Sequence, residues 1–289
     1  MTDSVLYEAP GPRARRRARY ASVVTALVLL AGLTWALYRF ATKGEFAYDK
    51  WGALVDPTNE NFTALWTLLG GGLVNTLMAA GWSILFSLVI GTLLALTRIT
   101  AAAWYRWAVV GVIELLRGTP VVVLIFFSAQ ALPALGLDIS LMWALVVGLT
   151  AYNCVIIAEI VRAGIAALPS GQSEAAYAVG MRRHQVMFSV LLPQAFRAML
   201  PALISQLVVV LKDTSLGFTI SYPEFVQRGE IAIENLGNQI QVYLVVAVVF
   251  ILINYTLSRV AVHTERALSR GSKSSAAARE PESAAATGD

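Results

Sequence analysis

Apolar residues in this chain are gathered into long blocks that are separated by shorter polar segments. A helix needs about 20 predominantly apolar residues to cross the hydrocarbon core of a bilayer. Blocks of this length predict transmembrane helices at residues 21–40, 72–97, 107–131, 141–162, 198–220 and 240–260. We therefore expect an all-α, polytopic membrane protein with about six transmembrane helices.

The polar segments between the blocks differ in charge. Arginines cluster at 13–19 before the first block and recur at 98–106, in 162–197 and after residue 258, whereas 222–238 carries three glutamates. Lys and Arg are enriched in cytoplasmic loops, so these basic segments belong on the cytoplasmic side. The alternation predicts that the N and C termini are both cytoplasmic.

The first block has a second interpretation. A basic start followed by an apolar stretch is also typical of a cleaved signal peptide. Trp35, Tyr38 and Phe40 near the end of the block resemble an interfacial belt, and no small-residue cleavage site follows. We favour a retained span that precedes a five-helix core.

These boundaries divide the chain into five regions. Residues 41–71 form an external loop, in which 65–72, with Trp66 and three glycines, fits either a short interfacial helix or an irregular start of the second span. The tail after residue 262 is rich in Ala, Ser, Glu and Arg and is predicted to be disordered. The full division is a basic cytoplasmic tail 1–20, the first span 21–40, the external segment 41–71, the membrane core 72–262 with a cytoplasmic loop 163–197, and the cytoplasmic tail 263–289.

Composition narrows the class of protein further. The chain is 57% hydrophobic and 14% charged, whereas soluble domains carry about 25% charged residues. The net charge of +4 is spread over span ends, which indicates membrane topology and not nucleic-acid binding. One cysteine and two distant histidines predict neither a disulfide framework nor a metal site. No nucleotide-binding P-loop and no hydrolase motif occurs, so we expect neither a cofactor nor an enzymatic activity in this chain.

The cytoplasmic loop 163–197 has room for two short helices. Ser173 is a candidate cap for a helix that begins at Glu174, and Gly180 permits a sharp turn because it adopts a positive φ without strain. A second helix at about 183–192 would end against Pro193. Small residues at the tip suit insertion into a groove of a partner; they are Ala175, Ala176 and Ala178.

Two groups of charged or hydroxyl residues fall inside predicted spans, where ionisable groups need a partner or a wet cavity. Glu114 and Arg117 share one helical face, and Gly118 and Pro120 just beyond them predict a kink or an unwound turn. This segment, with Thr119, either lines a translocation path or makes a structural ion pair at a subunit contact.

The second group is Lys212, Asp213, Thr214 and Ser215. It offers both signs of charge to an amino-acid zwitterion. Adjacent helical residues point about 100° apart, so both charges line one pore only if the helix unwinds locally, which Gly217 allows. The alternative is pairing with Glu114 or Arg117.

Other polar residues within spans favour structural roles. Glu159 and Arg162 share a face at the cytoplasmic end of the fourth span and are predicted to link that span to the loop. Single amides in apolar runs are more often contacts between helices than binding groups; they are Asn75, Asn153, Gln206 and Asn254.

The pattern E-A-A-x-x-x-G at 174–180, followed by Val190, Leu192 and Pro193, resembles the cytoplasmic EAA loop of ABC-importer permeases. Further motifs resemble the polar amino-acid permeases of that class; they lie at 114–120, 159–164, 168–172, 192–195 and 211–216. The opening segment 5–12 and the additional first span look like the glutamate-type permeases. Leu124 departs from the pattern, because family members often carry Gln there.

The resemblance implies a permease subunit in the cytoplasmic membrane that moves a polar amino acid, with glutamate favoured. It implies that the loop docks on an ABC ATPase dimer, so that ATP is bound by partner subunits. It also implies a second permease, identical or related, and an extracytoplasmic amino-acid-binding protein. The alternative is a secondary amino-acid carrier driven by an ion gradient, whose best support is the pair of intramembrane carboxylates Glu114 and Asp213.

Overall fold

The computed structural model describes residues 11–100 and 103–277, all of which are helix or short connection, with no strand in these ranges. The chain divides into two units, 1–62 and 63–289. The opening segment 5–12, which resembles the glutamate-type permeases, lies almost wholly outside the described residues.

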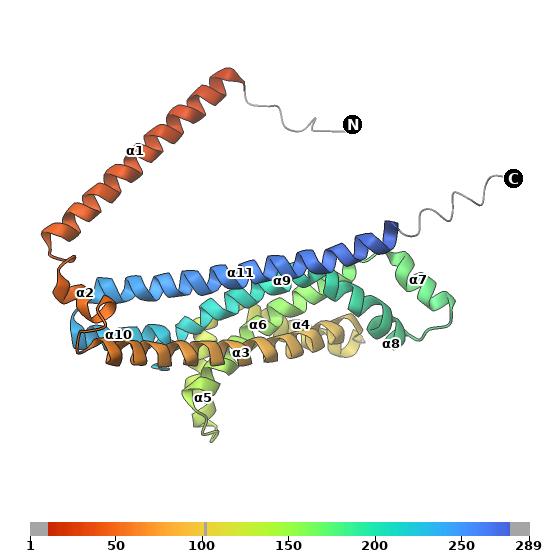
Figure 1. The fold of residues 1–289 in the computed structure, drawn as a ribbon. Helices are drawn as coiled ribbons and strands as arrows, with labels where there is room; N and C mark the ends of the chain where they lie inside the picture. The colour runs from red at the N-terminus through yellow and green to blue at the C-terminus, as the bar shows by residue number, and fades with distance from the viewer. Residues whose placement is uncertain (1–10, 101–102, 278–289) are drawn as a thin grey trace. The chain divides into compact units, whose positions relative to one another are not determined.

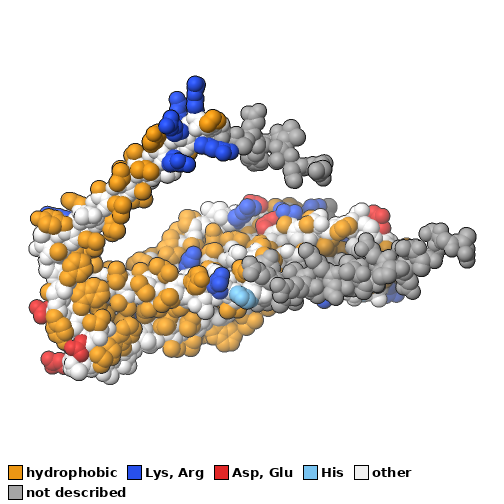
Figure 2. Space-filling model, turned by 45° about the horizontal axis from the view of Figure 1, so that its top comes forward, with side chains coloured by type: hydrophobic (Ala, Val, Ile, Leu, Met, Phe, Trp, Pro, Cys, Tyr) orange, Lys and Arg blue, Asp and Glu red, His pale blue; other side chains and the backbone are white. Residues whose placement is uncertain are grey.

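The first unit consists of helix α1 (Pro12–Thr42) and the short helix α2 (Tyr48–Val55). α1 contains the predicted first span and is long and apolar enough to cross a membrane. Five of its arginines gather at the N-terminal end, Arg39 lies in the last turn, and apolar side chains cover most of the length between them (Figure 2). Pro12 stands at the start of the helix, where its missing N–H costs no hydrogen bond.

The second unit begins with α3 (Phe62–Thr100), a continuous helix that includes the three glycines at 70–72. Residues 65–72 are therefore neither a separate interfacial helix nor an irregular segment. Close packing explains one of these glycines: a Cβ on Gly72 would lie 2.8 Å from Cγ of Arg228 and 3.0 Å from the Glu224 carbonyl oxygen. The absence of a side chain at Gly72 thus lets another segment approach α3 closely.

The third predicted span is broken. α4 (Ala103–Gly118) and α5 (Val121–Ala134) meet at an angle of 104° across Thr119 and Pro120. The residue before a proline is disfavoured in helical conformation, so the chain changes direction there. The predicted kink is confirmed. In the described residues, five helices are long and apolar enough to cross a membrane, or six if the bent pair forms one span, in agreement with the sequence.

The remaining helices complete the bundle (Figure 1). They are α6 (Leu141–Ala166), α7 (Ser170–Ala178), α8 (Arg183–Gln185), the π-helix η1 (Val186–Leu191), α9 (Leu192–Asp213), the 3₁₀-helix η2 (Thr214–Ile220), α10 (Phe225–Leu236) and α11 (Gln239–Ala277). α7 and α8 lie at one end of the bundle and α10 lies at the other (Figure 1).

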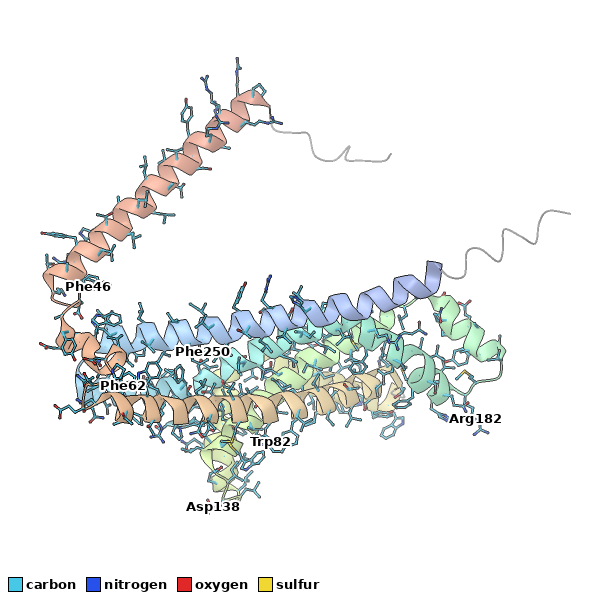
Figure 3. The ribbon with its side chains drawn as sticks, viewed as in Figure 1. Phe46, Phe62, Trp82, Asp138, Arg182 and Phe250 are labelled. Atoms are coloured by element: carbon cyan, nitrogen blue, oxygen red, sulfur yellow. The ribbon has the colours of Figure 1, made fainter. Side chains whose placement is uncertain are left out.

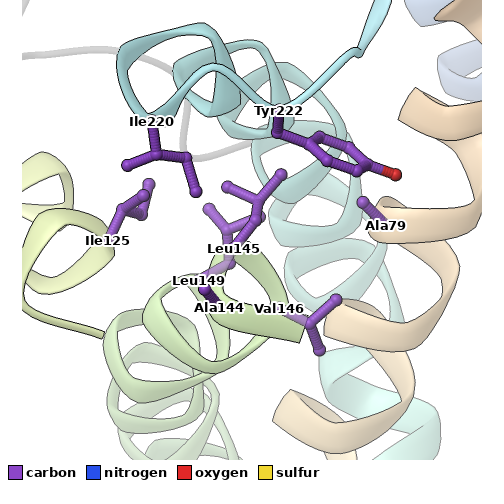
Figure 4. Close-up of a cluster of buried hydrophobic side chains, with 8 residues drawn as sticks. All are labelled: Ala79, Ile125, Ala144, Leu145, Val146, Leu149, Ile220 and Tyr222. Atoms are coloured by element: carbon purple, nitrogen blue, oxygen red, sulfur yellow. The ribbon is translucent and has the colours of Figure 1, made fainter. Parts of the chain in front are cut away.

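α6 is the central helix of this unit and the most buried of the candidate spans. Its Leu145 and Leu149 pack with Ile125 of α5 and Ile220 of η2 in one apolar cluster (Figure 4). Gly148 permits this contact, because a Cβ there would lie 2.6 Å from Cα of Ile125. Small residues of this kind let membrane helices approach closely.

α11 extends past the predicted core boundary at residue 262 and runs to Ala277. The expectation of disorder from residue 263 onward therefore differs from the structure for the first part of that tail, and residues 278–289 lie outside the described range.

Candidate functional site

The loop between α6 and α9 forms a compact helical projection. α7 begins at Ser170, with Pro169 in the N-cap position at ψ 134°. Ser173 lies inside the helix and donates from Oγ to the Ser170 carbonyl oxygen at 2.8 Å. The predicted start at Glu174 with a Ser173 cap was wrong, because Pro169 already sets the extended conformation that precedes a helix.

Gly180 makes the predicted turn. Its φ is +81°, and a Cβ there would meet nothing within 4 Å, so backbone conformation alone favours glycine. The Gly180 amide donates to the Tyr177 carbonyl oxygen at 2.9 Å, and the Met181 amide donates to that of Ala176 at 3.2 Å. These two bonds form a Schellman motif, which closes the C-terminus of α7.

The second half of the loop differs from the expected helix 183–192. A short α8 passes into η1, which contains Val190, and α9 then begins at Leu192 with Pro193 in its first turn. Pro193 therefore does not end a helix, because it lies within a helical stretch that continues from Arg183 to Ile220.

The projection buries one side and exposes the other. Ala176 is buried against the rest of the loop, whereas Glu174, Ala175 and Ala178 are exposed. Val179 at the tip is 77% exposed. Gln194 of α9 donates to Gln172 of α7 at 3.3 Å and helps to hold the two parts together.

Arg182 lies at this same end of the bundle (Figure 3). Its amide donates to Oε1 of Gln185 at 2.8 Å, which satisfies one backbone donor at the start of α8. The exposed surface of the projection therefore combines small and apolar side chains with a neighbouring positive charge.

An ion-pair cluster joins α6 to α3 near the loop, and it contains no residue of the loop itself, so it does not make the predicted link between the span and the loop. Glu159 accepts from Nε of Arg162 at 2.9 Å, as the sequence predicts, and also pairs with Arg98 of α3. Sequence reasoning missed Arg98, since a contact between residues so far apart has no local signal. The cluster fixes α3 against α6 just before the projection.

The first predicted path group lies at the break between α4 and α5. Glu114 and Arg117 are exposed, and no ion pair joins them in the described part of the chain. Thr119 donates from Oγ1 to the Leu115 carbonyl oxygen at 2.8 Å. Both charges are therefore available to groups outside this chain.

The second group lies where α9 tightens into η2. Lys212 is exposed, Asp213 is half-buried and Thr214 is buried. Thr214 and Ser215 each donate a hydroxyl to a backbone carbonyl oxygen three residues earlier, at 2.6 and 2.7 Å. The predicted local change of helix geometry is present, but no ion pair links this group to the first one among the described residues.

The two groups nevertheless belong to neighbouring segments. η2 packs on α5 through Ile220 and Ile125 (Figure 4). The helix that follows the break and the 3₁₀-helix that follows α9 are therefore in contact, although the two charged groups themselves are not joined.

Sequence reasoning also missed a polar network at the opposite end. Glu224 is fully buried and caps α10 by accepting from the amides of Val226 and Gln227 at 2.9 and 2.8 Å. Burial raises the pKa of Glu224 to about 7, although these two bonds act in the opposite direction. The sequence signal for this cap was a glutamate placed just before an amphipathic segment, since carboxylates are favourable at the start of a helix.

This network ties α10 to α3. Asn75 donates to the Pro223 carbonyl oxygen at 2.8 Å, the Tyr222 hydroxyl donates to the Asn75 carbonyl oxygen at 3.1 Å, and the Phe225 amide donates to Thr76 at 3.0 Å. Deeper in the bundle, Gln206 of α9 donates to Asn153 of α6 at 2.7 Å. The predicted contact between helices is confirmed for Asn153 and Gln206, whereas Asn75 bonds to the segment before α10 and Asn254 donates to the Phe250 carbonyl oxygen of its own helix.

Comparison with known proteins gives consistent results. Residues 87–270 match the family described as binding-protein-dependent transport system inner membrane component. The chain is 42% identical over 231 residues to the glutamate transport system permease protein GluD of Corynebacterium glutamicum, covering 79% of this chain and 83% of that protein. It is 31% identical over 208 residues to the L-cystine transport system permease protein TcyB of Bacillus subtilis, covering 72% and 89%.

A solved structure shares the fold. The crystal structure of an amino acid ABC transporter with histidines superposes with a TM-score of 0.66 at 27% identity, covering 71% of this chain and 96% of that one.

Proposed function

Since the chain belongs to the family of binding-protein-dependent transport system inner membrane components, we propose that it is the permease of an ATP-driven importer of glutamate. It is a multi-pass protein of the cytoplasmic membrane, and its family consists of transport proteins rather than enzymes. The observation that carries the proposal is the projection between α6 and α9, whose turn at Gly180 presents exposed small and apolar side chains.

The projection is the docking element for an ABC ATPase. Ala175 and Ala178 allow close approach of a partner backbone, and Val179 offers apolar area that binding would remove from water. η1 connects this surface directly to α9, so displacement of the projection moves a membrane helix. ATP is then bound and hydrolysed by a pair of ATPase subunits, and no step of that chemistry occurs in this chain.

Exposed charges within the membrane span support a second permease subunit. Glu114 and Arg117 are exposed on α4, and a charged side chain that faces lipid costs at least about 2.5–3.5 kcal/mol. Contact with a second permease, or a water-filled path between two of them, removes that cost. We assign Glu114, Arg117, Thr119, Lys212, Asp213, Thr214 and Ser215 to the surroundings of this path.

The favoured substrate is glutamate, because the relative with 42% identity is a glutamate transport permease, and an extracytoplasmic binding protein would deliver it. Reconstituted vesicles test the whole proposal. We expect uptake of radiolabelled glutamate only with the ATPase, the binding protein and ATP present. Uptake driven by a proton or sodium gradient without the ATPase would instead establish the carrier alternative.

Orientation is tested with a matched pair of cysteines. Val179 at the projection and Leu135 at the turn after α5 are 77% and 76% exposed, and the native Cys154 is buried. We expect a membrane-impermeant maleimide to label Val179→Cys only in inverted vesicles and Leu135→Cys only in intact cells. The reverse pattern would exclude ATPase docking at the projection.

A further inference from the structure

An open groove runs along α3 beside η1 and the start of α9. It consists of two adjoining pockets of about 510 and 390 Å³ that share Leu93, Leu96 and Phe188. The volumes fall within the range of about 300–1,000 Å³ that is typical of ligand sites. All of its walls belong to the second unit.

The groove has one apolar end and one polar end. The apolar end is lined by Leu88, Val89, Thr92, Leu192 and Phe196 in addition to the shared residues. The polar end is lined by Thr97, Thr100, Arg183 and His184, with Met187. A ligand that matches this division carries a charged or hydroxylated head on a long apolar chain.

The length of the groove fits one leaflet of a membrane. Residues 88–100 of α3 span about 18 Å at 1.5 Å per residue, and half of the hydrocarbon core is about 15 Å thick. The polar end lies at the end of α3, and α4 begins shortly afterwards with Trp104 and Trp107, which are 78% and 74% exposed. Exposed tryptophans are typical of the membrane interface, which is the depth of a lipid headgroup.

The polar end has charge complementarity for an anionic headgroup. Arg183 donates from Nη2 to the Ile99 carbonyl oxygen at 3.4 Å, which holds its guanidinium beside the end of α3. A guanidinium has five N–H donors, and no carboxylate pairs with Arg183 in the part of the chain that the structure describes. His184 adds a ring N–H donor beside it.

The hydroxyls favour a particular headgroup. Thr97 and Thr100 donate to the carbonyl oxygens of Leu93 and Leu96, both at 2.8 Å, so their own oxygens remain available as acceptors. The site therefore offers cationic donors to a phosphate and two acceptors to hydroxyl groups. A phosphoglycerol headgroup presents both.

We propose that this groove binds an anionic phospholipid with a glycerol headgroup, such as phosphatidylglycerol, with the phosphate at Arg183 and His184 and one acyl chain along Leu93 and Phe188. Arg183, His184 and Phe188 belong to the loop that carries the projection. The bound lipid thus touches the segment between the projection and α9.

The test uses the full chain in nanodiscs and native mass spectrometry of retained phosphatidylglycerol against phosphatidylcholine. We expect the double variant Arg183→Gln, His184→Gln to lose about fivefold or more in selective retention, since each surface cation contributes about 1 kcal/mol to binding of anionic lipid. The matched control is Arg182→Gln, which removes the same charge one residue away but does not line the groove.

A second variant tests the apolar end. Leu93 is 57% exposed, so Leu93→Trp fills the groove without disturbing the core, and we expect it to reduce retention as well. Equal loss in Arg182→Gln would indicate diffuse surface charge and overturn the proposal. Displacement of the lipid by soluble glycerol phosphate would also overturn it, and so would unchanged retention in Leu93→Trp. Disulfide cross-linking of Phe188→Cys to a second copy of the chain would show that a protein covers the groove, and would overturn the proposal as well.

Discussion

The end of the bundle that carries α7, α8 and η1 exposes apolar side chains, whereas the end that carries α10 buries polar ones. Tyr177 and Val179 of the projection are 48% and 77% exposed, while Glu224 at the other end is fully buried. The projection is attached to α9 by a single side-chain bond between Gln194 and Gln172 among the described residues. The opposite end is held by hydrogen bonds among α3, α10 and the segment between η2 and α10.

This difference indicates what each end contributes to coupling and to stability. Apolar area left exposed in water is a surface available for association, because binding removes it from solvent. Buried polar groups that are joined by hydrogen bonds instead specify one packing of the chain. We infer that the projection contributes to coupling with little effect on stability, and that the α10 end contributes to stability with little direct effect on coupling.

The largest expected effect comes from Gly180→Asp. It should reduce ATP-dependent uptake more than tenfold while leaving membrane insertion normal, since an Asp at φ +81° distorts the turn and adds charge to the docking surface. Gly136→Asp is the matched control, because Gly136 also has φ +81° and an added Cβ would meet nothing within 4 Å, but it lies after α5. Equal loss of uptake in both variants would show that the effect is not specific to the projection and would contradict the prediction.

Glu224→Ala should have the largest effect on stability. It leaves the partly buried amides of Val226 and Gln227 without their acceptor, which costs about 2 kcal/mol. Thermal unfolding in detergent measures this loss. Glu224→Gln keeps one acceptor oxygen and should lose about half as much; an unchanged unfolding temperature in both variants would show that this end does not stabilise the bundle.

The same residue predicts a pH dependence. Its pKa is raised by burial from an ordinary value of 4.5 to about 7. Between these two values the folded state binds more protons than the unfolded state, so stability should fall as pH rises from about 4.5 to 7 and level off above. Glu224→Gln has no titrating group at this position, so its unfolding free energy should depend less on pH in this range. Any pH dependence that remains in this variant must come from other groups.

An intermediate effect is expected where the projection joins the membrane helices. Arg98→Gln removes the link between α3 and Glu159, whereas Arg162→Gln removes a partner on the same helix as Glu159. We expect a loss of about 1 kcal/mol for Arg98→Gln and less for Arg162→Gln, since the pair is partly solvated. Unfolding temperatures of both variants decide this order, and a larger loss in Arg162→Gln would contradict it.

The smallest effect is expected between the two ends. The bond from Gln206 to Asn153 joins α9 to α6 in the middle of the bundle. A double-mutant cycle with Gln206→Leu and Asn153→Leu should give a coupling free energy of about 0.6 kcal/mol in the unfolding reaction. A coupling as large as the loss in Glu224→Ala would place the main polar stabilisation in the centre and not at the α10 end.

The sequence was sufficient for features that depend on local rules. Blocks of about 20 apolar residues predicted the spans because bilayer thickness sets helix length. Pro120 predicted the break between α4 and α5, and Gly180 predicted the turn with positive φ, since both follow from the backbone of a single residue. The E-A-A pattern indicated the transporter family, because its positions lie close together in the chain and are recognisable without the fold.

Only the tertiary structure decided which distant residues meet. Arg98 pairs with Glu159, and Glu224 becomes buried, because helix packing brings segments together that no local pattern relates. The close approach of Arg228 to Gly72 likewise appears only in the tertiary structure, as does the π-helix η1 that precedes α9. Membrane helices associate through small-residue contacts and single polar bonds, and these carry too little sequence signal to fix partners before the fold is known.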